Sequence, residues 1–214
     1  LDTQIDSGQP ALSNSSDATF VLSSPFPSVI FDCRLDDGGW AACANPAIYT
    51  GLGEGSHTFQ GRARNAGGHI DLTPVAYTWT VDAVFPETTI VSGPPNPTNV
   101  ITAEFTFSSP DSTAQFECRL NSSSWTPCTS PKTYYPLGDA QHTFEVRATD
   151  AAGTTDPTPA SHIWTIDRVA PDTAIDSGPP NPTNSSSATF SLSSPEATAT
   201  FECWLDYIGT MSAC

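Results

Sequence analysis

Basic residues are scarce in this 214-residue chain: seven lysines and arginines stand against 23 aspartates and glutamates, for a formal charge of −16. The scarcity argues against nucleic acid as a partner, because phosphate recognition needs clustered basic side chains. It argues equally against an anionic membrane surface. Only 14% of the residues are charged, so the acidity is spread thinly and serves solubility or, as a sharper interpretation, divalent cation binding.

Long apolar runs and helical patterns are also missing. No stretch approaches the roughly 18 apolar residues of a membrane span, so we predict no membrane insertion. No window shows an apolar helical period together with caps. No leader is visible, since Leu1 already lies inside a repeat, and we therefore expect a mature or excised segment of a longer protein.

What the chain has instead is an internal repeat with a step of 85 residues. The step relates Cys33, Cys118 and Cys203, and it also relates His57 to His142. Many further matches keep the same step without gaps, which is the signature of tandem modules. The repeat predicts domains at 1–85 and 86–170, and the N-terminal half of a third at 171–214.

Six cysteines fall into three local pairs with none left over: Cys33 with Cys43, Cys118 with Cys128, and Cys203 with Cys214. Their spacing is poor for zinc, which wants four clustered ligands, and for a CxxC redox pair. We interpret them as disulfides, with free buried thiols as the alternative. Disulfides place the protein outside the cell, either secreted or on a cell surface.

Short alternating segments between Gly, Pro and Asn clusters predict an all-β chain of sandwiches. In the second repeat we expect strands at Thr88–Ser92, Ala103–Ser108, Ala114–Leu120, His142–Ala148 and His162–Asp167. Each cysteine pair then flanks a hairpin. For the second we expect Cys118 opposite Cys128 and a three-residue loop at 122–124.

Signatures of catalysis are missing as well. No GxSxG elbow, P-loop or dinucleotide-binding glycine pattern occurs. We interpret His57 and His142 as surface residues beside an acidic turn. A repeated module is also a poor host for one unique cleft with paired carboxylates. We predict that the protein is not an enzyme and has no catalytic residues.

Three motifs carry a family resemblance: Asn181-Pro182-Thr183-Asn184, the segment FEVRATD at 144–150, and Trp164-Thr165-Ile166-Asp167. They resemble the tandem bacterial immunoglobulin-like repeats of large secreted and cell-surface proteins. The resemblance covers both full repeats and the first half of the third. It implies immunoglobulin-like β-sandwiches that serve as stalks, adhesin shafts or fibre modules, and no catalysis.

The acidic junctions are the first candidate site. Asp150, Asp156, Asp167 and Asp172 cluster around the boundary between repeats 2 and 3. Ca²⁺ prefers several oxygen ligands on flexible turns, and the resemblance implies calcium near such loops and junctions. The alternatives are a calcium site, as the only possible cofactor, and solvated turn residues.

The tryptophans are the second candidate. Trp79 and Trp164 alternate with core positions and should be buried. Trp40 and Trp125 lie at the hairpin tips. Each either covers its disulfide or offers a flat face to a glycan or another partner.

The third repeat should leave Phe190, Leu192, Phe201 and Leu205 uncovered, because the strands that would face them are missing from it. Either the chain continues beyond Cys214 or a neighbouring copy supplies the missing layer.

Together these observations predict a non-catalytic extracellular structural repeat protein: a stalk, adhesin shaft or surface filament subunit. Its expected partners are other copies or neighbouring repeats and, beyond these, a cell-surface glycan or protein. The alternative is a carbohydrate-binding array that uses the hairpin tryptophans.

Overall fold

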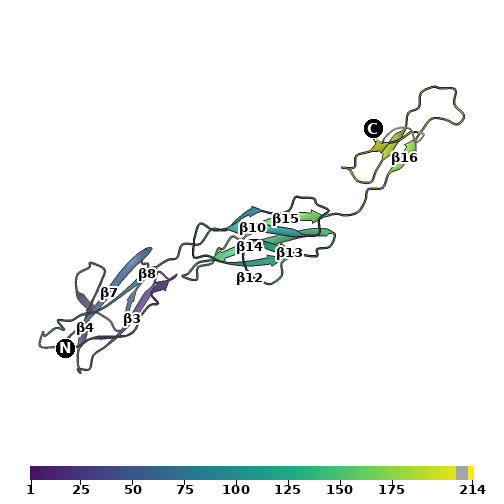
Figure 1. Cartoon of the computed structure of the whole chain (residues 1–214). Helices are drawn as coiled ribbons and strands as arrows, with labels where there is room; N and C mark the ends of the chain where they lie inside the picture. Colours follow the sequence, from purple (N-terminus) through teal and green to yellow (C-terminus); the bar gives the residue numbers. More distant parts are fainter. Residues whose placement is uncertain (206–211) are drawn as a thin grey trace. The chain divides into compact units, whose positions relative to one another are not determined.

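The computed structural model describes residues 1–205 and 212–214, and all their regular structure is β (Figure 1). The chain divides into two compact units, Leu1–Ile166 and Asp167–Cys214. The first unit holds repeats 1 and 2, and the second holds the third repeat. Within the described ranges, no helix is long and apolar enough to cross a membrane.

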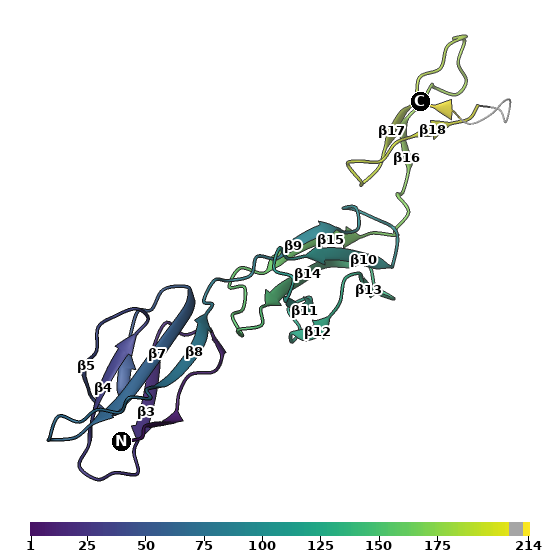
Figure 2. The same ribbon diagram turned by 60° about the vertical axis from the view of Figure 1, so that its left-hand side comes forward.

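Repeat 1 is a sandwich of two sheets. A five-stranded sheet has the order β2-β8-β7-β4-β5, and a three-stranded sheet has the order β1-β3-β6. Figure 2 shows β4, β7 and β8 side by side. The strands are β1 (Gln4–Ser7), β2 (Leu12–Ser13), β3 (Ala18–Ser23), β4 (Ile30–Leu35), β5 (Ala41–Cys43), β6 (Ala47–Tyr49), β7 (Gly55–Arg64) and β8 (Val75–Val81).

Repeat 2 repeats this arrangement with the sheets β12-β11-β14-β15 and β13-β10-β9. Its counterpart of the β2–β8 pairing is a single parallel bridge between Thr98 and Ile166. The strands are β9 (Thr89–Ser92), β10 (Ala103–Ser108), β11 (Gln115–Leu120), β12 (Thr126–Cys128), β13 (Lys132–Tyr134), β14 (Ala140–Thr149) and β15 (Ala160–Ile166). No strand is shared between the repeats, while the exact boundaries near residues 85 and 170 stay a prediction.

Each of the two sandwiches closes around its own aromatic core. Alternate residues of each strand point inward, so Phe105 of β10 meets Phe144 of β14 with ring centroids 4.0 Å apart. In repeat 1, Phe20 stacks on Phe59 at 4.2 Å. Trp164 packs against the edge of the Phe105 ring and is fully buried. Its equivalent Trp79 is buried too, which confirms the core assignment of this pair.

The hairpin register differs from the expected one. Cys118 pairs with Thr126, and Phe116 pairs with Cys128, so the two cysteines are diagonal neighbours on one face. The connecting loop is longer than expected, because the strands end at Leu120 and resume at Thr126. The physical reason is the left-handed backbone at Asn121 and its successor, with φ of 52° and 59°. These residues form a wide turn, and the Asn121 N–H donates to the Thr143 carbonyl of β14 instead of closing a tight hairpin.

The disulfides of the structure follow this diagonal arrangement. They join Cys33 to Cys43, Cys118 to Cys128 and Cys203 to Cys214, with Cα–Cα distances of 5.6, 5.8 and 5.7 Å. These distances are typical of a disulfide, which explains how a diagonal pair is bridged without distortion of the strands.

The second unit contains two short strand pairs, β16 (Ala174–Ser177) with β17 (Ser191–Ser193) and β18 (Glu202–Cys203) with β19 (Ser212–Ala213). Phe190 and Leu205 are exposed, at 47% and 67%. Leu192 and Phe201 are intermediate. The one-residue insertion that lengthens the third hairpin falls at 206–211, outside the described residues.

Candidate functional site

In each of the two complete repeats, the larger sheet carries arginines on its outer face, and together these two faces hold five of the seven basic residues of the protein. Outward positions alternate with the core positions of β11 and β14, and in repeat 2 they hold two glutamates and two arginines. Arg119 donates to both carboxylate oxygens of Glu145 at 2.7 Å. Arg147 donates two bonds to Glu117, at 3.0 and 2.7 Å. The bonds to Glu145 raise the pKa of Arg119 above its usual range.

Trp125 completes this face. The guanidinium carbons of Arg119 and Arg147 lie 4.4 and 4.5 Å from the centre of its ring. Such cation–π contacts hold the guanidinium groups in fixed positions. Because Arg119 alternates with the inward Cys118, the Trp125 ring lies on the opposite face of the sheet from the disulfide. The hairpin tryptophan therefore anchors arginines and does not cover the disulfide.

Repeat 1 builds the same face with a different charge balance. Arg34 and Arg62 lie 4.9 and 4.2 Å from the ring centre of Trp40. Arg34 donates to the neutral Oε1 atom of Gln60. A single carboxylate, Asp32, serves both Arg62 at 3.6 Å and a third arginine, Arg64, at 3.3 Å.

The sequence interpretation missed these arginines. It singled out the tryptophans by their position at the hairpin tips, but not their neighbours. A usable signal was present in the alternation of the strands, because Glu117, Arg119, Glu145 and Arg147 all occupy outward positions. Charged residues that recur at every second position of adjacent strands face one another across the sheet.

The equivalent histidines His57 and His142 lie near the start of β7 and of β14. His57 has two acceptors, with Nδ1 2.9 Å from Asp36 Oδ2 and Nε2 2.9 Å from the Gly53 carbonyl. Two acceptors favour the doubly protonated ring, and hydrogen bonds to Gly53 and Asp36 raise the pKa of His57. Burial opposes ionisation of Asp36, but bonds from His57 and Thr58 outweigh it and lower the Asp36 pKa.

In repeat 2 the equivalent of Asp36 is Asn121, so the histidine there faces an amide and not a carboxylate. His142 Nε2 lies 2.9 Å from the Gly138 carbonyl, and Nδ1 lies 3.1 Å from Asn121 Nδ2. The Asn121 Oδ1 atom accepts from the Thr143 N–H, so its amide nitrogen is the donor toward His142. His142 is 7% exposed, so the expectation of a surface histidine is wrong for this residue. The ring is buried because it packs on Trp164.

Three of the four acidic candidates for calcium accept hydrogen bonds from neighbouring residues of their own loops. Asp150 Oδ1 accepts from the Thr154 N–H at 2.8 Å. Asp156 Oδ1 accepts from the N–H and the hydroxyl of Thr158. Asp167 Oδ1 accepts from the Val169 N–H.

Asp156 and Asp150 are buried, at 3% and 6% exposure, while Asp172 is exposed. Burial opposes ionisation of Asp156, but hydrogen bonds from Thr88 and Thr158 outweigh it and lower its pKa. In the part of the chain that the structure describes, no three His, Cys, Asp or Glu side chains are grouped to hold a metal ion.

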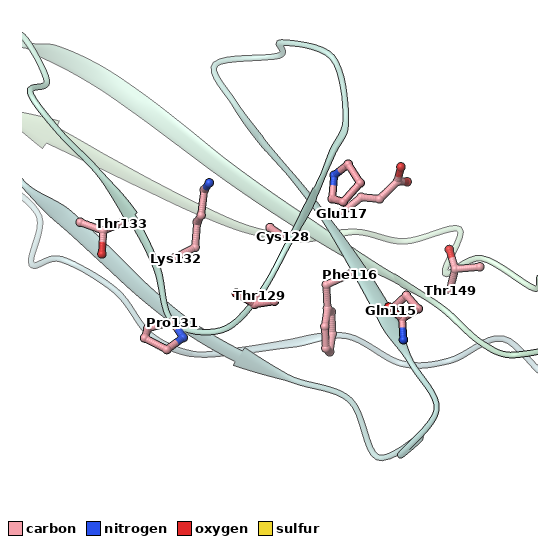
Figure 3. Close-up of a pocket in the computed structure, with 10 residues that line it drawn as sticks. Gln115, Phe116, Glu117, Cys128, Thr129, Pro131, Lys132, Thr133 and Thr149 are labelled. Atoms are coloured by element: carbon pink, nitrogen blue, oxygen red, sulfur yellow. The ribbon is translucent and has the colours of Figure 1, made fainter.

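Each of the two complete repeats has an open groove at the edge where the chain crosses from the larger sheet to the smaller one. In repeat 2 the groove has a volume of about 830 Å³ and lies between β11, β12 and β13 (Figure 3). Its walls include Phe116, Pro131 and the Cys128 end of the disulfide, with Glu117 and Lys132 as charged members. A smaller groove of about 560 Å³ lies at the same edge of repeat 1. Neither lining contains a nucleophile next to an oriented base.

Comparisons with known proteins give only distant structural likenesses. No protein-family model matches the chain, and no curated protein matches it. Fibronectin(III)-like modules of Clostridium thermocellum CbhA are 16% identical, with 77% of this chain and 94% of that chain covered and a TM-score of 0.48.

Murine CEACAM1b is 10% identical over 78% of this chain and 99% of that one, with a TM-score of 0.39. A tetra-tandem repeat from the extending region of a large adhesion protein is 16% identical, over 82% of this chain and 51% of that one, with a TM-score of 0.31. The sandwich architecture therefore rests on the strands described above, and function has to be argued from this chain's own residues.

Proposed function

We propose that the protein is a non-catalytic, extracellular structural repeat protein of the bacterial immunoglobulin-like type, which serves as a stalk, adhesin shaft or surface filament subunit. The observation that carries this proposal is the self-contained repeat. Repeats 1 and 2 each close a complete sandwich around their own core and their own disulfide. A module of this kind can be added in series without a change in its neighbours.

Location and stiffness are part of the proposal. Disulfides persist in oxidising compartments, so all six cysteines being bridged supports a secreted or cell-surface protein. The links between repeats are short and contain Pro86 and Pro171, which restrict the backbone. The proposed role needs no cofactor, and its partners are neighbouring repeats, other copies, or a surface to which the shaft attaches.

A carbohydrate-binding array built on Trp40 and Trp125 finds less support. Sugar stacking needs an open ring face, whereas guanidinium groups already lie over both rings. Both side chains are also only partly exposed.

Small-angle X-ray scattering tests the shaft directly. A compact protein of this length would have a radius of gyration of about 17 Å. Modules in series, each adding roughly 30 Å judged from strand length, should give about one and a half times that value. The expected result is an enlarged radius of gyration that does not change with protein concentration. A value near that of a compact globule would refute the shaft.

A further inference from the structure

The guanidinium clusters of the two repeats differ in how many carboxylates serve them. In repeat 2 each arginine has its own glutamate: Arg119 pairs with Glu145, and Arg147 with Glu117. At the equivalent positions of repeat 1, Gln60 stands in place of Glu145, and Arg64 stands in place of Thr149. One aspartate therefore faces three arginines, and the face carries two uncompensated positive charges.

This excess stands out against the rest of the molecule. The protein has seven basic residues and a net charge of −16. Three of the seven gather within one small area of β4 and β7, where Arg64 keeps 36% and Arg62 keeps 20% of its side chain exposed. A concentrated positive patch on an otherwise acidic protein attracts anions locally, because more distant charges are screened at physiological salt.

The cluster is also held in place before any ligand arrives. The Trp40 ring fixes Arg34 and Arg62 through cation–π contacts, and Asp32 fixes Arg64. Guanidinium groups that are already oriented lose little conformational entropy on binding. Their planar forks match the geometry of a carboxylate, which accepts two parallel hydrogen bonds.

We propose that this face of repeat 1, formed by Arg34, Arg62, Arg64 and Trp40, binds a carboxylate-bearing polysaccharide, with the arginines contacting the uronate groups. The carboxylates of the ligand replace those that repeat 2 supplies from its own strands. Trp40 acts as a positioning residue that holds the arginines. The inference goes beyond the shaft role, which remains intact if this face binds nothing.

A polysaccharide fits the face better than a second copy of the chain. A second copy would carry its own net charge of −16 toward a protein of the same net charge, and the repulsion between the two molecules outside the patch opposes the approach. A single polysaccharide chain is narrow, so its carboxylates reach the patch without a large acidic surface following them.

The test uses the full chain and an oligogalacturonate, with the same oligomer reduced to neutral alcohols as the ligand control. Gln60→Glu and Arg64→Thr give repeat 1 the residues that repeat 2 already accommodates, so both variants should fold. Each lowers the net charge of the face by one unit and should weaken binding by up to about fivefold, as expected for a surface ion pair. Gln4→Glu, on the exposed β1 strand of the other sheet, adds the same charge elsewhere and is the matched control.

The expected result is salt-sensitive binding of the oligogalacturonate, weakened by Gln60→Glu and Arg64→Thr and unaffected by Gln4→Glu. Glu145→Gln should in turn give repeat 2 a new binding face for the oligogalacturonate, with a lower affinity than that of repeat 1. Three results would overturn the proposal: no binding at low salt, equal losses with Gln4→Glu, or equally tight binding of a glutamate oligomer of matched charge. If the wild-type protein dimerises and Gln60→Glu abolishes the dimer, the face binds a second copy of the chain instead.

Discussion

The disulfide of repeat 2 should contribute about 3 kcal/mol to that repeat's stability and nothing to repeat 1. Cys118 and Cys128 are ten residues apart in sequence, and the chain-entropy model gives about 3 kcal/mol for closing a loop of that size. Cys118 is fully buried, so alanine keeps its position apolar in the double variant Cys118→Ala, Cys128→Ala. For a small module, the loss is a large share of a marginal total.

Hydrogen exchange read by mass spectrometry measures this effect repeat by repeat in the intact chain. Peptides from β14 report on repeat 2, and peptides from β7 report on repeat 1 as the internal control. A loss of about 3 kcal/mol corresponds to roughly a hundredfold faster exchange through global opening of repeat 2. Exchange in β14 that accelerates less than about fivefold would refute the reasoning, and so would equal acceleration in β7, because the repeats would then not be independent.

Three further predictions follow from the site. His57 has a raised pKa and Asp36 a lowered one, so their pair stabilises repeat 1 most between the ordinary Asp and His pKa values. The contribution is lost as pH rises through the His57 pKa or falls through the Asp36 pKa. Asp36→Asn should flatten this pH dependence in thermal melts, whereas Asn121→Asp should introduce it in repeat 2; melts of both variants that track the wild type would contradict the pairing. Trp125→Ala should increase the mobility of the Arg119 and Arg147 side chains in Nε–H NMR spectra and lower stability by roughly 1 kcal/mol, since two cation–π contacts at a partly exposed site are lost; unchanged arginine spectra would argue against the contacts. EDTA should leave the melting temperature unchanged, because Asp150 and Asp156 already accept hydrogen bonds from their own loops; a melting temperature that rises on Ca²⁺ addition would establish the calcium alternative.

The strands of repeat 2 were predictable because their inward residues alternate without interruption. Phe105 and Phe107 on β10, and Phe144 and Val146 on β14, are all buried, as a period of two requires. The β13 strand was not predicted, since Lys132–Tyr134 is too short to show a period. Three residues fit either a strand or a loop until a partner strand is known, and here that partner is β10.

The hairpin register was not predictable from the cysteine spacing alone. The diagonal pair Cys118 and Cys128 has a Cα separation of 5.8 Å, which a disulfide spans as readily as the separation of directly opposite residues. The deciding feature is the positive φ at Asn121. Asparagine tolerates this conformation but does not demand it, so the residue type signals a turn without specifying its length.

The comparison of the two repeats separates what the fold requires from what is free to change. Both repeats keep the aromatic stack, the buried tryptophan and the disulfide, each of which stabilises the packed core of its sandwich. Both also keep an aspartate that hydrogen-bonds a threonine two residues later, Asp71 in repeat 1 and Asp156 in repeat 2. The tip and the outer face differ instead, with Asp36 against Asn121 and Gln60 against Glu145. These exchanges change the charge of a side chain but hardly its volume, and they lie outside the core, so the packing of the core is the same in both repeats. Differences of this kind are therefore where a repeated scaffold can acquire distinct binding properties from one module to the next, which is why the charge excess of repeat 1 is the feature to test first.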